Sequence, residues 1–172
     1  LGTVEFVPCE ISQSSGSGVA QAECAKFSVL ENPSTPQGRR IELALTLLPA
    51  RASKPKADLV TMLAGGPGQS AVDAYFSVQP VLNALRAERH VLLVDQRGTG
   101  GSNRLACPLP DWESERKPTN AELREQAVQC LKQHESHADV RWYTSSDAVR
   151  DLEAVRVAVG APQFNLVGGS YG

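Results

Sequence analysis

The chain has 172 residues, of which 41% are hydrophobic, and its formal net charge is −2 at pH 7. That length suits one domain with a sizeable core. The slightly acidic balance argues against nucleic acid as a partner, because binding to phosphates requires a clustered basic face. No apolar run approaches the roughly 20 residues that a membrane-spanning helix needs.

The four cysteines form two pairs that are local in sequence, Cys9 with Cys24 and Cys107 with Cys130. None belongs to a C-x-x-C motif, which disfavours a zinc or thioredoxin-type site. A Cys9–Cys24 bridge would close a loop of about 15 residues and stabilise the fold by about 3 kcal/mol. The even count and local pairing favour two disulfides over four buried thiols, and therefore a periplasmic or secreted location.

The first half of the chain predicts a hairpin followed by buried strands. Residues 1–23 are rich in Ser, Gly and Gln and are expected to form a loose N-terminal arm. Apolar residues alternate over 25–30 and 41–48, which predicts an antiparallel hairpin of half-buried strands. The continuous apolar runs Leu59–Leu63 and Val91–Val94 are typical of parallel strands covered on both faces.

Helices and strands alternate from there to the end of the sequence. A helix is expected over 78–88 with Val81, Leu82 and Leu85 inward. The sequences Thr119-x-x-Glu122 and Thr144-x-x-Asp147 are capping boxes that open two further helices. The first would place Leu123, Ala127, Cys130 and Leu131 on an apolar face.

A short strand over 164–167 completes an α/β sheet with right-handed crossovers. We expect no domain boundary within residues 24–172, and we expect 102–143 to be an excursion that the Cys107–Cys130 bridge holds in place.

The last residues carry the strongest chemical signal. They read Gly168-Gly169-Ser170-Tyr171-Gly172 and follow the predicted strand directly. G-x-S-x-G after a strand predicts a nucleophile elbow, a sharp strained turn that lifts a serine hydroxyl out of the sheet. Gly168 and Gly172 would let the next helix pack close to the strand. The alternative is an ordinary glycine-rich turn, but the preceding strand and capped helix favour Ser170 as a catalytic nucleophile.

A second glycine-rich segment follows Leu59–Leu63 and reads Ala64-Gly65-Gly66-Pro67-Gly68-Gln69-Ser70. A serine that forms an acyl-enzyme needs hydrogen-bond donors for the developing oxyanion. One donor is the N–H of the residue after the nucleophile, here Tyr171, and the other comes from a loop after an earlier strand. Gly66 is the first choice for this second donor, and Gly65 is the second.

The same loop permits a rival interpretation. Gly66-x-Gly68-x-x-Ala71 fits the dinucleotide-binding fingerprint, and Asp95 at the end of the next strand could hold a ribose. Three points disfavour this. The preceding hairpin is foreign to that fold, Pro67 removes an N–H that a pyrophosphate would use, and the Ser170 elbow is left unexplained.

Asp95 and Arg97 begin the segment after Val91–Val94. Either could be catalytic, but buried charges usually persist by pairing, so a structural role that ties loops together is favoured. Asp95 also precedes the serine, whereas in this fold the catalytic acid follows it. His90 begins a strand, and His134-x-x-His137 lacks a third ligand, so neither a general base nor a metal site is expected here.

Together these motifs resemble the prolyl aminopeptidase and tripeptidyl aminopeptidase family of α/β-hydrolases. The resemblance rests on Gly65-Gly66-Pro67-Gly68, on Asp95-Gln96-Arg97-Gly98-x-Gly100-x-Ser102 and on Gly169-Ser170-Tyr171-Gly172, and it runs from about Cys24 to the last residue. Tyr171, the cysteines and the hairpin are more similar to the secreted tripeptidyl-type branch. Ala64 departs from the family, since many members have His there.

The resemblance implies an α/β-hydrolase fold, cleavage of short peptides from a free amino end, and no metal or cofactor. The triad of such chains runs Ser, then Asp or Glu, then His. We therefore expect residues 1–172 to be the N-terminal half, inactive alone, with the acid and the His on a missing C-terminal half. An esterase of the same fold, and a non-catalytic fragment, are the alternatives.

Overall fold

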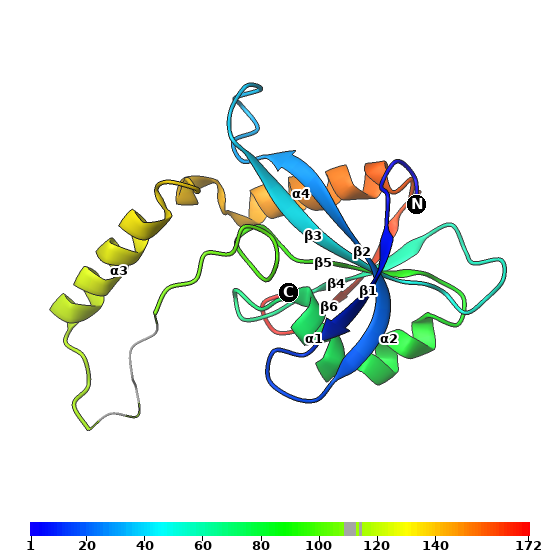
Figure 1. The fold of residues 1–172 in the computed structure, drawn as a ribbon, viewed down its shortest axis with the longest axis horizontal. Coiled ribbons are helices and arrows are strands. Elements are labelled where there is room, and N and C mark those ends of the chain that lie inside the picture. Colours follow the sequence, from blue (N-terminus) through cyan, green and yellow to red (C-terminus); the bar gives the residue numbers. More distant parts are fainter. Residues whose placement is uncertain (109–112, 114) are drawn as a thin grey trace.

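The computed structural model describes residues 1–108, 113 and 115–172. Within these residues one mixed sheet carries helices on both faces (Figure 1). The strands are β1 Val7–Ser12, β2 Val19–Leu30, β3 Arg40–Leu48, β4 Leu59–Leu63, β5 Val91–Val94 and β6 Phe164–Gly168. The helices are α1 Ala71–Ser77, α2 Gln79–Leu85, α3 Asn120–His134 and α4 Ser145–Ala158, with a 3₁₀ turn, η1, at Val140–Trp142.

The order of strands in the sheet is β1-β2-β3-β5-β4-β6. β1, β2 and β3 form an antiparallel meander, and β3 also pairs antiparallel with β5. β5, β4 and β6 are mutually parallel, with β4 in the middle. Because the carboxyl ends of parallel strands lie at one edge of a sheet, the segments that follow β4, β5 and β6 converge there.

Alternation along the central strands divides the core into two clusters. Leu92 and Val94 face the cluster that contains Val155 of α4. Their neighbours Val91 and Leu93 face the opposite cluster, which α1 and α2 cover. Successive strand residues point to opposite faces, so β5 is fully buried, as its continuous apolar sequence predicted.

Several predictions about local structure differ from the observed fold. Residues 7–12 and 19–23, expected in a loose arm, form β1 and the start of β2. The helix expected over 78–88 is the shorter α2, Gln79–Leu85, which has Pro80 in its first turn, and a separate helix that was not expected, α1, precedes it at Ala71–Ser77. Val81, expected inward, is 57% exposed, whereas Leu82 is fully buried.

α3 projects away from the sheet as part of the 102–143 segment (Figure 1). The predicted capping box is present, since Thr119 and Glu122 satisfy each other's backbone N–H groups. The apolar face expected for α3 is not covered, because Ala127 and Leu131 are exposed and the buried side chains are Cys130 and His134. The Cys107–Cys130 disulfide joins α3 to the segment that follows β5. The Cys9–Cys24 disulfide joins β1 to β2.

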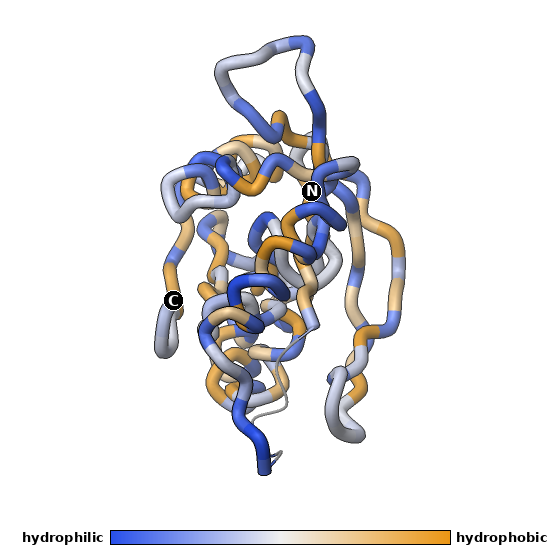
Figure 2. The backbone as a smooth tube through the Cα atoms, turned by 90° about the vertical axis from the view of Figure 1, so that its left-hand side faces the viewer, coloured by the Kyte–Doolittle hydropathy of each residue, from blue (hydrophilic) through white to orange (hydrophobic). Residues whose placement is uncertain are grey.

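The hydropathy of the backbone agrees with this arrangement. The turn between β2 and β3, which projects from the top of the molecule, is largely hydrophilic (Figure 2). In the part of the chain that the structure describes, every helix is too short or too polar to cross a bilayer.

Candidate active site

Ser170 follows β6 at the edge of the sheet where the parallel strands end. Its φ is +60°, a left-handed conformation that non-glycine residues rarely adopt. Strained residues of this kind persist where the surrounding structure requires them, and they cluster at functional sites. The turn after β6 therefore has the backbone geometry expected of a nucleophile elbow, and the Ser170 side chain is exposed at its tip.

Glycines allow the backbone to approach closely around this turn. A Cβ on Gly65 would lie 3.0 Å from the Cβ of Ser170 and 3.0 Å from the carbonyl oxygen of Gly169. A Cβ on Gly168 would lie 2.7 Å from the carbonyl oxygen of Gly172, and one on Gly172 would overlap the carbonyl oxygen of Leu63. The predicted glycines thus close the turn on itself and onto the end of β4.

The loop after β4 and the elbow both present free backbone donors. Among the described residues, neither the Gly66 N–H nor the Tyr171 N–H donates a hydrogen bond to a protein acceptor. The Gly65 N–H is also unpaired in this part of the chain. All three sequence-predicted donors lie in the elbow or in the loop after β4, whose Gly65 packs against Ser170, and an oxyanion hole requires donors beside the nucleophile.

Asp95 anchors the same loop from the end of β5. One carboxylate oxygen accepts hydrogen bonds from the Ser70 hydroxyl, at 3.0 Å, and from the Ala71 N–H, at 2.7 Å. The other accepts from the Gly101 N–H at 2.8 Å. Asp95 is only 5% exposed. Its carboxylate thus ties the start of α1 to the turn that contains Gly101, and both of its oxygens are engaged within the protein.

Arg97 forms a buried two-pronged ion pair with Asp151 of α4. Its Nε and one terminal nitrogen each lie 2.7 Å from a carboxylate oxygen of Asp151. The guanidinium also donates to the carbonyl oxygens of Glu31 and Trp142, at 2.9 and 2.5 Å. Arg97 therefore joins the β2–β3 hairpin, η1 and α4, a structural role.

The sequence prediction missed the partners of this network. Asp151 lies one turn before the buried Val155 on α4, and a charged residue on the core side of an amphipathic helix was the available signal. Glu31 is 3% exposed and accepts hydrogen bonds from the Asp139 N–H and the Tyr143 hydroxyl. Burial of the phenol, with the nearby Glu31 carboxylate, raises the pKa of Tyr143 to about 12.

The three histidines of the chain lie away from Ser170. His90 precedes β5, so it is at the amino end of the parallel strands, and Ser170 is at their carboxyl end. His134 ends α3 and His137 follows it, in the projecting segment (Figure 1). As expected from the sequence, none is positioned to take a proton from the serine.

Comparison with known proteins agrees with the geometry of the elbow. The chain is 29% identical over 133 residues to YuaR of Escherichia coli K12, covering 77% of this chain and 26% of that protein. It is 25% identical to a tripeptidyl aminopeptidase of Streptomyces coelicolor, covering 87% of this chain and 30% of the relative. It is 26% identical to the serine protease Hip1 of Mycobacterium tuberculosis, covering 98% of this chain and 35% of the relative.

The chain thus spans only about a quarter to a third of the length of these relatives. A match to a family model covers residues 58–172, from just before β4 to the turn that carries Ser170. That region contains the three parallel strands, both glycine-rich loops and the elbow, and by this match the chain belongs to the family of hydrolases with the alpha/beta hydrolase fold.

Proposed function

We propose that the protein to which this chain belongs is a serine peptidase that releases short pieces or single residues from the free amino end of peptides. The observation that carries the proposal is the position of Ser170, held at φ +60° at the end of β6 with Gly65 packed against it. Unpaired N–H groups of Gly66 and Tyr171 flank the same position.

The mechanism follows from this arrangement. The Ser170 Oγ attacks the carbonyl carbon of the scissile bond while a general base removes its proton. The carbonyl oxygen becomes an oxyanion, to which Gly66 and Tyr171 donate their N–H groups. The base returns the proton to the leaving amine, and water then hydrolyses the acyl-enzyme. In this fold the acid and the histidine follow the serine in sequence, so we assign them to residues beyond 172.

The preference for peptides is supported by the names of two relatives, a tripeptidyl aminopeptidase and a serine protease. A carboxylic-ester hydrolase is the second candidate, because a serine nucleophile and an oxyanion hole also cleave esters. The two disulfides support a periplasmic or secreted location for the enzyme, since such bonds persist in oxidising compartments.

A comparison of substrates with the full-length protein tests the proposal. Tripeptide amides with a free amino end, the same amides with an acetylated amino end, and short-chain esters are compared by kcat/KM. The proposal predicts turnover of the free tripeptides, a large loss on acetylation, and loss of all turnover in Ser170→Ala but not in Ser53→Ala, which alters an exposed loop serine. Turnover of esters alone would establish the esterase, and equal cleavage of acetylated peptides would exclude an aminopeptidase.

A further inference from the structure

The buried end of α3 brings a histidine against the Cys107–Cys130 disulfide. One ring nitrogen of His134 and the two sulfur atoms all lie within 4.8 Å of one another. His134 is 8% exposed, and its Nε2 has no hydrogen-bond partner in the described structure. A buried ring nitrogen without a partner is costly, so the position is one that a ligand would satisfy.

The second histidine orients the first. The Nδ1 of His134 lies 3.1 Å from the Nε2 of His137, and the Nδ1 of His137 lies 3.4 Å from the Ser136 hydroxyl. If His134 Nδ1–H donates to His137, the lone pair of His134 is on Nε2, the free nitrogen. Metal-binding histidines usually use their other N–H in this way, which fixes the tautomer and the ring plane.

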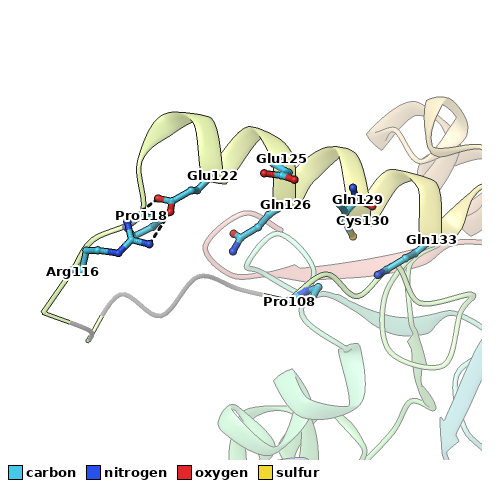
Figure 3. Close-up of a pocket in the computed structure, with 9 residues that line it drawn as sticks. All are labelled: Pro108, Arg116, Pro118, Glu122, Glu125, Gln126, Gln129, Cys130 and Gln133. Carbon is cyan, nitrogen blue, oxygen red and sulfur yellow. Dashed lines mark hydrogen bonds and ion pairs between the residues drawn. The ribbon is translucent and has the colours of Figure 1, made fainter.

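One of the two disulfide-bonded cysteines is exposed to solvent. Cys107 is exposed, although Cys130 is buried. A cavity of about 400 Å³ runs along α3 beside the disulfide, and Cys130 and Gln133 lie on the side of the helix that faces Pro108 (Figure 3). A reductant can approach Cys107, and water can enter next to Cys130.

We propose that Cys107, Cys130 and His134 form a site for Zn²⁺ or a similar transition metal when the disulfide is reduced. A dithiol reductant gives two electrons and two protons to the S–S bond, which breaks to two thiols, and the dithiol becomes a disulfide. The metal then binds the two thiolates and His134 Nε2, and two protons are released. Water from the adjacent cavity completes four-coordination.

The donor set and spacing fit this metal. Zinc favours cysteine sulfur and histidine nitrogen in tetrahedral geometry. Two Zn–S bonds of about 2.3 Å place the sulfur atoms about 3.8 Å apart. The two sulfur atoms therefore have to move apart when a metal replaces the disulfide bond. The Cα atoms of Cys107 and Cys130 are 5.6 Å apart, so side-chain rotation supplies that separation. Two thiolates also neutralise the charge of the ion in a partly buried place.

The disulfide and the metal are therefore alternative links across one site. Either one ties α3 to the segment at 107, so the 102–143 excursion stays attached in oxidising and in reducing surroundings. The sequence did not reveal the site, because Cys107 lies 27 residues upstream of His134 and neither cysteine belongs to a C-x-x-C motif.

The test uses the full-length protein, reduced with dithiothreitol, freed of reductant without oxygen, and titrated with Co²⁺. The background variant Cys9→Ser/Cys24→Ser removes the other cysteine pair of residues 1–172, and unfolding curves check that each variant is folded. We expect one Co²⁺ per chain, a thiolate-to-cobalt charge-transfer absorption, displacement by Zn²⁺, and no binding to the oxidised protein. His134→Gln should weaken the affinity at least tenfold, and His90→Gln should leave it unchanged.

Two outcomes would overturn the proposal. One is the absence of a thiolate absorption in reduced protein that is folded. The other is an affinity that His134→Gln does not alter. Should the double serine variant fail to fold, the wild-type background is used with Cys130→Ser and His134→Gln, and the absorption must be lost in the first and weakened in the second. A band that survives Cys130→Ser would place the metal on other cysteines and would overturn the proposal.

Discussion

Gly65 lies directly against Ser170, so close that a Cβ on the glycine would be 3.0 Å from the Cβ of the serine. The two residues are 105 positions apart in the chain. They meet because β4 and β6 are adjacent parallel strands, paired from Leu59 with Phe164 to Leu63 with Gly168, and the two loops leave the sheet together. The register of one strand pair therefore sets the spacing between the nucleophile and its oxyanion loop.

Gly65→Ala should reduce activity with little loss of fold. The new methyl group would push the loop away from the elbow, and a displacement of about 1 Å at a reacting centre can cost 10²-fold in rate. We expect kcat to fall about 10²-fold in the full-length enzyme. Gly169→Ala is the matched variant, because its Cβ would enter open space, and it should lose far less. Equal losses in the two variants would contradict a specific contact between Gly65 and Ser170.

Breaking the Arg97–Asp151 pair should destabilise the fold. Removal of one partner leaves a buried charge uncompensated, which costs about 3–5 kcal/mol. We expect Arg97→Ala and Asp151→Ala each to lower the free energy of unfolding by that amount in denaturant titrations. Arg97→Lys should not rescue stability, since an ammonium group cannot reproduce the two-pronged geometry. A loss below about 1 kcal/mol would show that the network is not structural.

Asp95→Asn separates a structural from a catalytic role for this acid. The asparagine keeps one acceptor oxygen, but its NH₂ group faces the N–H of either Ala71 or Gly101, which then loses its acceptor. This loss should lower the free energy of unfolding by about 1–3 kcal/mol. The pH dependence of kcat/KM should keep its shape, because Asp95 does not exchange protons with the substrate. Loss of the acidic limb in a variant of normal stability would assign Asp95 to the chemistry.

His90 should make the fold less stable below neutral pH. Burial lowers the pKa of the ring from its ordinary value of 6.5, and the neutral Nδ1 accepts a hydrogen bond from the Ala50 N–H at 3.2 Å. Because the folded-state pKa is the lower one, the unfolded chain binds a proton first as the pH falls through 6.5. The stability that is complete above 6.5 is thus lost below it, with a slope of at most about 1.4 kcal/mol per pH unit.

The pH effect is measured as the difference between wild type and His90→Gln in unfolding free energy across that range. A glutamine keeps an acceptor but does not titrate, so its curve should be flatter than that of wild type. Two parallel curves would show that the pKa of His90 does not differ between the folded and the unfolded state, which would contradict the prediction.

The parallel part of the fold could be predicted from the sequence because its strands are buried on both faces. Leu59–Leu63 and Val91–Val94 are continuous apolar runs, and the structure begins and ends β4 and β5 at those residues. β1 could not be predicted in this way. It is an edge strand with exposed Val7, and its sequence lacks a clear alternation of apolar and polar residues. The residues of β1 therefore carry no local signal of their pairing with β2.

The site was predictable where one short motif carries the geometry. The G-x-S-x-G turn encodes the strain at Ser170, and the glycines after β4 encode the close approach to it. The hydrogen-bond network of Arg97 and the cluster of His134 with the two cysteines could not be predicted, because the residues that form each of them come from several elements. Asp151, Glu31 and Trp142 meet Arg97 only when α4 and η1 fold back over the hairpin.

The assignment of Ser170 as the nucleophile is tested most directly by a fluorophosphonate probe on the full-length protein, followed by mass mapping of the modified peptide. The account predicts one label per chain on Ser170, its loss in Ser170→Ala, and a fall in kcat on the order of 10⁶ in that variant. A label on another residue, or an alanine variant that keeps most of its activity, would contradict it.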